Sequence, residues 1–176
     1  MSNRAIVLAI CVILAVEISA EETRVMNAQG KYAATFPTNW IIWGPDSLGA
    51  VGATTYPKDS AAGGGIVPPG EASITIYTDA KGTATLDQWI AQSLRFTEEV
   101  RRATIAPRKS GAAIKSYIEI EARDDVAPGI YYRTVTDYFK RGNRLFAIRL
   151  EYKEGDPRAS EYRAALGSVV NTFSPY

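Results

Sequence analysis

The sequence predicts an α+β fold: an antiparallel β-sheet with a C-terminal three-stranded meander, flanked by two main helices. Three consecutive segments, 113–122, 129–139 and 145–152, have strand-like patterns, and the connections between them are too short to hold a crossover helix. Segments at about 85–102 and 157–172 carry apolar residues at helical spacing. The chain has 176 residues, of which 46% are hydrophobic, so it can bury one core without disulfides or metals.

The residue inventory excludes several classes of function. The chain has no histidine, and its only cysteine is Cys11. A serine-histidine-aspartate triad, a cysteine-histidine pair, a histidine-bound metal and an internal disulfide are therefore impossible. Carboxylate or lysine chemistry and an oxygen-ligand cation site stay open. Because 20 basic residues balance 19 acidic ones, we expect no nucleic-acid binding. We also expect no enzyme activity, no cofactor and no metal.

The N-terminal segment 1–20 has the pattern of a secretory signal peptide. Twelve apolar residues, Ala5–Val16, follow the positively charged Arg4. At about 1.5 Å per residue they span about 18 Å, short of the roughly 30 Å hydrocarbon core of a bilayer. The small residues Ser19 and Ala20 favour cleavage after Ala20 and a periplasmic or secreted protein. The alternative is an uncleaved anchor, which would be the only membrane contact.

Residues 21–30 are polar and predict a flexible leader, so the single α+β domain is expected to cover 31–176. Residues 31–36 predict a first strand that stops at Pro37, because proline cannot donate to the ladder. Residues 40–43 predict a short second strand. We expect Trp40 to anchor the core rather than form a binding platform, since large aromatic side chains are usually buried.

Residues 49–56 predict a further strand, weakened by two glycines. The stretch 57–71 concentrates turn formers, including Gly63–Gly65. Its glycines lack the spacing of phosphate-binding loops and precede a strand rather than a helix, so we expect a surface loop. Residues 72–78 then alternate between apolar and polar side chains, as a half-buried strand does.

A capping box predicts the start of the first main helix. Thr85 stands as the N-cap, and Gln88 follows three residues later. The helix has an apolar stripe that should pack on the sheet; it consists of Leu86, Trp89, Ile90, Leu94 and Val100. The segment 98–102 places acids before bases and predicts a solvated helix end rather than a charged site. Pro107 lies in the break after the helix.

The first and third strands of the meander have clear inner and outer faces. Ile118 and Phe146 fall on the inner faces, whereas Glu119 and Arg149 fall on the outer ones. The middle strand, 129–139, has no clear apolar face. A slip of one residue in its pairing would exchange its two faces.

The turn at 141–143 decides that register, and it fits hairpin loops of two, three or four residues. A three-residue loop sets Arg133 opposite Glu151 and brings Asp137 diagonal to Arg149, so opposite charges meet on the outer face. We prefer this register for its charge pairs.

A two-residue loop at Gly142-Asn143 is the alternative. It sets Phe139 opposite Phe146, which favours packing of the two aromatic rings.

With the three-residue loop, the outer face of the meander carries a candidate recognition surface of six side chains. They are Tyr117, Glu119, Arg133, Asp137, Arg149 and Glu151. The alternative is that these are compensated pairs on a solvated sheet face.

The closing helix, 157–172, is expected to begin with Asp156 as N-cap and Pro157 in the first helical position. Its apolar stripe consists of Tyr162, Leu166, Val169, Val170 and Phe173.

The entry to the domain resembles that of PsbP-like domains. The motif begins with Tyr32 and continues with Phe36-Pro37, two further residues and Trp40. It matches the order aromatic residue, proline, two residues, tryptophan. The later strands and a closing helix that ends near Phe173 are also similar, so the resemblance covers roughly 31–173. It implies an antiparallel sheet with helices on both sides, in an extracytoplasmic domain without an established catalytic centre.

From these observations we expect an extracytoplasmic, non-catalytic interaction or stabilising module of the PsbP-like type, with an envelope protein as its partner. The alternative is a small-molecule-binding domain that uses an aromatic and polar sheet face or pocket.

Overall fold

The computed structural model describes residues 22–57, 66–79, 84–123 and 128–176. The predicted signal peptide and the three consecutive glycines, 63–65, lie outside these residues. In the ranges that are described, no helix is both long and apolar enough to cross a membrane.

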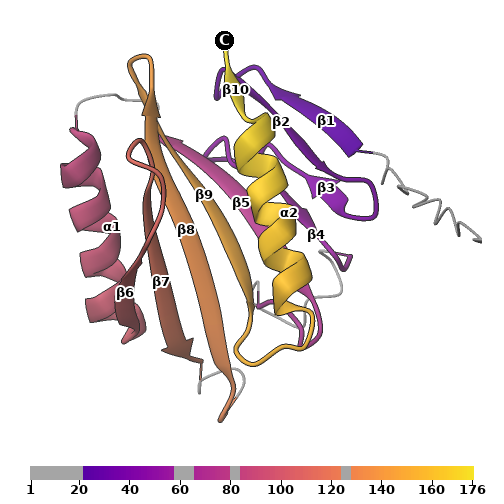
Figure 1. Ribbon diagram of the computed structural model, residues 1–176, viewed down its shortest axis with the longest axis vertical. Coiled ribbons are helices and arrows are strands. Elements are labelled where there is room, and N and C mark those ends of the chain that lie inside the picture. Colours follow the sequence, from indigo (N-terminus) through magenta and orange to yellow (C-terminus); the bar gives the residue numbers. More distant parts are fainter. Residues whose placement is uncertain (1–21, 58–65, 80–83, 124–127) are drawn as a thin grey trace, which may run out of the picture.

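A seven-stranded antiparallel sheet forms the centre of the domain (Figure 1). Its strands lie in the order β3-β4-β5-β9-β8-β7-β6. Their bounds are β3 Ile41–Trp43, β4 Val51–Thr54, β5 Ala72–Asp79, β6 Thr104–Arg108, β7 Lys115–Ala122, β8 Tyr131–Arg141 and β9 Arg144–Lys153.

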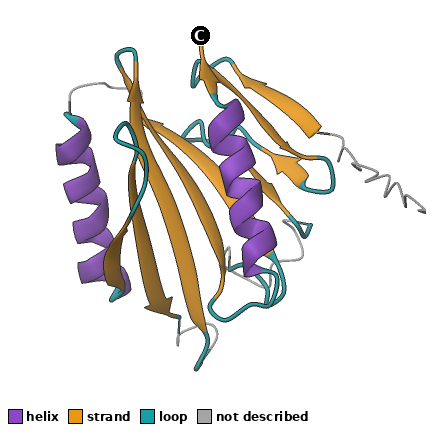
Figure 2. Cartoon of the chain, viewed as in Figure 1, coloured by secondary structure: helices purple, strands orange, loops and turns teal. Residues whose placement is uncertain are grey.

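Two helices and a small second sheet complete the fold (Figure 2). The helices are α1, Leu86–Arg101, and α2, Ala159–Thr172, on opposite faces of the large sheet. The small antiparallel sheet has the order β1-β2-β10, formed by β1 Glu22–Asn27, β2 Tyr32–Pro37 and β10 Ser174–Pro175. The predicted α+β class, with a C-terminal meander between two main helices, is confirmed.

The meander β7-β8-β9 is antiparallel, but its register is not the one we preferred. Arg141 pairs with Arg144, so the hairpin has the two-residue loop Gly142-Asn143. Phe139 therefore lies opposite Phe146, with ring centroids 5.9 Å apart. Burial of these aromatic rings decides the register, because charge pairs on a sheet face contribute little by comparison.

The main core lies between the large sheet, α2 and β2. Phe139 and Phe146 from the meander meet Tyr32 of β2 and Tyr162 of α2, and all four are almost fully buried. Trp40 is 6% exposed and packs edge-to-face on Tyr162 at 6.4 Å, so the prediction that it anchors the core is confirmed.

Three local predictions were wrong. The segment predicted as a flexible leader contains β1, which pairs with β2 from Glu22 to Asn27. The break around Pro107 is the edge strand β6, where a proline is tolerated on the unpaired side. Helix α2 begins after Arg158, and Asp156 instead accepts the Arg158 N–H at 2.8 Å. A polar segment can form an edge strand when the neighbouring strand has unpaired backbone N–H and C=O groups. Local composition and periodicity do not show where such unpaired groups lie.

Candidate functional site

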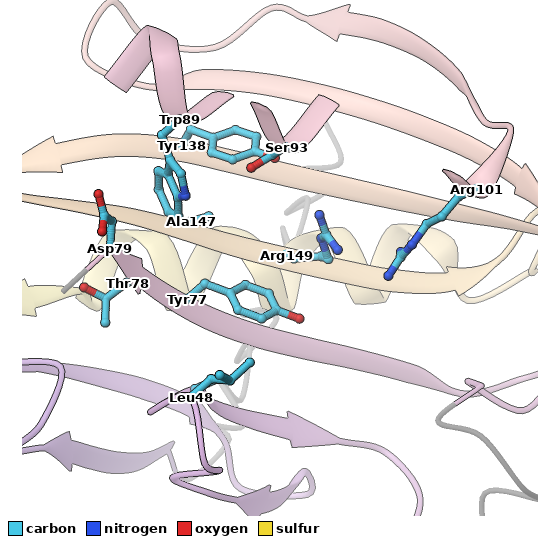
Figure 3. A pocket seen from close by; sticks show the side chains of 11 residues that line it. Leu48, Tyr77, Thr78, Asp79, Trp89, Ser93, Arg101, Tyr138, Ala147 and Arg149 are labelled. Atoms are coloured by element: carbon cyan, nitrogen blue, oxygen red, sulfur yellow. The ribbon is translucent and has the colours of Figure 1, made fainter. Parts of the chain in front are cut away.

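A cleft of about 530 Å³ opens between α1 and the face of the large sheet that α1 covers. It is lined by Leu48, Ala50, Tyr77, Thr78, Asp79, Trp89, Ser93, Arg101, Tyr138, Ala147 and Arg149. A second hollow of about 340 Å³ continues along α1 and shares four of these residues. In Figure 3 the two arginines lie at one end of the cleft, and Thr78 and Asp79 lie at the other.

Strand alternation and the helix stripe build the aromatic walls of the cleft. Tyr77 on β5 lies opposite Ala147 on β9, which in turn lies opposite Tyr138 on β8, so all three share one face. Trp89 of α1 packs edge-to-face on Tyr138, with ring centroids 5.7 Å apart. Ala147 has only a methyl group between two tyrosines, and the small side chain leaves room for the cleft.

Arg149 is the cation at the back of the cleft. It pairs with Thr136 across the ladder, and its Nε donates to the Thr136 hydroxyl oxygen at 3.3 Å. The guanidinium carbon lies 5.6 Å from the centroid of the Tyr77 ring, a cation–π distance. Within the described ranges, no carboxylate lies within ion-pair distance of Arg149.

Glu119 is a buried carboxylate beneath α1, near Arg149. It is 1% exposed and lies opposite Thr134. Among the described residues, neither Glu119 Oε1 nor the Thr134 hydroxyl has a hydrogen-bond partner. Burial raises the pKa of the Glu119 carboxyl; the charge of Arg149 is the main opposing influence.

The other carboxylates on this face are paired. Arg123 binds Glu121 and lies 3.1 Å from Glu151 Oε1, with its guanidinium 5.1 Å above the Tyr132 ring. Arg101 lies 3.7 Å from Glu121 Oε1. These opposite charges compensate one another, so in the described part of the chain Arg149 is the cation that faces the cleft without a carboxylate in contact.

The structure divides the six predicted site residues between the two faces of the sheet, which corrects the single surface that we predicted. Tyr117, Glu119, Arg149 and Glu151 share the face that α1 covers. Arg133 and Asp137 lie on the α2 face. The two-residue loop is the cause, since it shifts β8 by one residue and turns its side chains over.

Arg133 and Asp137 each have local partners. The Arg133 Nη2 atom donates to Glu154 Oε1 at 2.8 Å. Asp137 is buried and lies 3.1 Å from Arg108 Nη2, and Ser116 also donates to it. Both residues therefore have a structural role in this arrangement.

The shared face is also covered rather than solvated. Glu119 is buried under α1, and Tyr117 packs edge-to-face on Tyr138 at 6.1 Å. Arg149 is the one predicted site residue among those that line the cleft.

Sequence reasoning missed most of the lining residues. Trp89 was placed in the core stripe of the helix, and Arg101 in a solvated helix end. Tyr77 and Tyr138 follow serine and threonine residues on the polar faces of their strands. An aromatic residue within such a polar face is the signal that could have indicated them.

The described lining of the cleft offers aromatic, hydroxyl and guanidinium groups. Asp79 is the single carboxylate among the described lining residues, so no carboxylate pair faces the cleft. Nor do the described residues include a cluster of three or more acidic side chains that could hold a metal ion. Burial raises the pKa of the Tyr138 hydroxyl, which makes that tyrosine a hydrogen-bonding group at neutral pH.

No family model matches the chain, and no curated protein matches it either. Solved structures do resemble it. The Ran-binding protein Mog1p of Saccharomyces cerevisiae has a TM-score of 0.55 at 13% identity, over 89% of this chain and 96% of Mog1p. A Bacteroides thetaiotaomicron protein has a TM-score of 0.50 at 12% identity, over 87% of this chain. The chain spans about half of that protein's length, 48%.

The cyanobacterial PsbP of Synechocystis sp. PCC 6803 has a TM-score of 0.46 at 13% identity, over 96% of this chain and 99% of that one. At such identities the likeness concerns the fold alone. The chain therefore has a fold similar to that of Mog1p.

Proposed function

We propose that the chain is an extracytoplasmic, non-catalytic interaction module that docks a protein partner at the rim of the cleft. The observation that carries this proposal is the set of exposed apolar side chains along the rim. Leu48 is 81% exposed on one side, and Phe96 of α1, which lines the adjoining hollow, is 54% exposed on the other. Large apolar side chains gathered beside a cleft are typical of protein-binding surfaces.

Two further observations support the proposal. Mog1p, which shares the fold, is a Ran-binding protein. The absence of histidine, and of any cysteine after Cys11, is consistent with a binding rather than a catalytic role.

A photo-crosslinking experiment tests the docking surface. A photoreactive phenylalanine analogue replaces Phe96 at the rim in one variant and Tyr131 in a control variant, in the cell that makes the protein. Tyr131 is also 54% exposed but lies on β8 rather than at the cleft. We expect a crosslinked partner of one defined mass from position 96 and none from position 131.

Equal crosslinking from both positions would indicate a nonspecific surface and contradict the proposal. A crosslink that Leu48→Asp leaves unchanged would contradict the part of the proposal that spans both sides of the cleft.

The proposed location is tested by the mass of the mature protein. We expect cleavage after Ala20, so the purified protein should begin at Glu21 and be found in the periplasm or the medium. An intact N-terminus with the protein in the membrane fraction would favour the anchor instead.

A small-molecule-binding domain is the second candidate function. The volume of the cleft, about 530 Å³, favours it, since ligand pockets are typically about 300–1,000 Å³. Mass spectrometry of the purified protein under native conditions tests it. A bound small molecule that is lost in Arg149→Gln would support this candidate.

A further inference from the structure

We propose that the cleft binds a small amphipathic monocarboxylate: its carboxylate group lies on the guanidinium of Arg149, and its apolar body lies against Trp89 and Tyr77. This inference rests on the second candidate function and names the class of ligand. The proposal depends on three features of the cleft, which are its unpaired cation, its charge balance and its apolar walls.

Among the residues that the structure describes, Arg149 differs from its neighbours in having no carboxylate within ion-pair distance. Arg108, Arg123 and Arg133 each contact a carboxylate within 3.1 Å. Among the described residues, Arg149 donates through Nε to the Thr136 hydroxyl, and the side chains of Arg149 and Tyr138 interact. A guanidinium held in place through Nε presents a planar pair of N–H donors, which matches a carboxylate in bidentate geometry.

The charges around Arg149 favour a single negative charge on the ligand. The negative charges of Glu119 and Glu151 raise the pKa of Arg149, so there is already a negative potential near its guanidinium. A dianion such as a phosphate monoester would meet repulsion from these carboxylates. A ligand with a single negative charge meets less of this repulsion than a dianion does.

The walls of the cleft select an apolar body. Trp89 and Tyr77 are half-buried aromatic side chains on opposite sides of it, and Ala147 forms its floor between them. Ala50 and the exposed Leu48 continue the apolar lining toward the mouth. An aromatic or short aliphatic chain fits against these surfaces, and the adjoining donors fix the orientation of the acid.

Titration of the purified full chain with three small probes tests the proposal. The probes are 4-phenylbutyrate, its neutral amide and phenyl phosphate, and binding is measured by calorimetry and by chemical-shift changes at the Trp89 indole. We expect saturable binding of the acid, and binding of the amide and of the phosphate that is at least about tenfold weaker. The amide lacks the negative charge that pairs with the guanidinium, and the carboxylates near Arg149 repel the phosphate dianion.

Two variants locate the site. Arg149→Gln should weaken binding of 4-phenylbutyrate by at least about tenfold. Arg133→Gln is the matched control, because Arg133 lies on the other face with Glu154, and it should bind as the wild type does. Thermal unfolding establishes that each variant is folded.

Several results would overturn the proposal: equal affinity for acid and amide, unchanged affinity in Arg149→Gln, or no saturable binding of the acid. If Arg149→Gln does not fold, the comparison of acid with amide on the wild type decides. If acetyl-phenylalanyl-glutamyl amide binds and 4-phenylbutyrate does not, the small-acid proposal is wrong and the ligand is an acidic peptide segment of a partner. Crosslinking from position 96 reports separately on the docking surface, so the two proposals can fail independently.

Discussion

Glu119 occupies a position where an ionised carboxylate is costly. It is buried beneath α1, and its Oε1 atom has no hydrogen-bond partner among the described residues. Burial raises its pKa above the ordinary value of 4.5. Proton binding is therefore stronger in the folded state than in the unfolded state. The contribution of Glu119 to stability is most favourable below about pH 4.5 and is lost as the pH rises through the folded-state pKa.

This sign leads to a prediction for Glu119→Gln. Since glutamine does not titrate, the free energy of unfolding of the variant should rise relative to the wild type between pH 4 and pH 8. Urea unfolding of both proteins at the two pH values measures the change. Glu98→Gln on the exposed side of α1 controls for the loss of one negative charge. A difference between Glu119→Gln and wild type that does not vary with pH would contradict the prediction.

Single residues differ in how well the sequence reported their roles. Trp40 was predicted in the core from its size and its place beside a turn, and it lies there. Tyr138 alternates with threonines on the middle strand, for which the pattern predicted no clear apolar face, and it is 1% exposed. Only the packing of Trp89 and Tyr117 around it explains that burial.

Among the elements, the start of α1 could be predicted in atomic detail. Thr85 accepts the Gln88 N–H at 3.2 Å, and the Gln88 side chain accepts the Thr85 N–H at 2.8 Å. The capping box is thus confirmed. It is a local motif of four residues, so tertiary contacts are not needed to form it.

Thr85→Ala should lower the free energy of unfolding by about 1 kcal/mol, because the N–H of Gln88 loses its acceptor. The measurement is urea unfolding. Gln92→Ala, further along the exposed side of the same helix, is the control and should change stability by less than about 0.5 kcal/mol. An equal loss in both variants would mean that general helix content, rather than the cap, is responsible.

The β8-β9 hairpin depends on Gly142, whose φ of +57° stands at the first central position of its two-residue loop. Nothing lies within 4 Å of a Cβ added at Gly142 or at Gly167 of α2, so neither substitution is limited by space. Gly142→Ala should cost about 1 kcal/mol through backbone strain. Gly167→Ala should stabilise the protein by about 0.5–1 kcal/mol through helix propensity. Thermal unfolding of both variants tests the opposite signs, and a shared sign would contradict the assigned backbone conformations.

At the scale of the whole molecule, Phe173 joins parts of the fold that are distant in sequence. Its ring lies 5.3 Å from Tyr32 of β2, 5.1 Å from Phe139 of β8 and 4.8 Å from Phe146 of β9, between ring centroids. It follows α2 directly and precedes β10. Phe173 therefore connects both sheets and the second helix.

Phe173→Ala should destabilise the whole domain by about 3 kcal/mol, since it removes an aromatic ring from three aromatic contacts. Urea unfolding measured by both far-UV circular dichroism and tryptophan fluorescence should show one coincident, shifted transition. Phe96→Ala, an exposed position, should change stability by less than about 0.5 kcal/mol. Separate transitions by the two probes would mean that Phe173 stabilises only the small sheet.

The sequence by itself determined the α+β class, the meander, the cap of α1 and the absence of histidine. These features follow from composition, from local periodicity or from motifs of a few neighbouring residues. The tertiary structure alone decided the register of β8, the edge strands β1 and β6, and the cleft under α1. Each depends on which distant surface covers a segment. A slip of one residue costs little locally but moves Arg133 and Asp137 to the opposite face from Arg149.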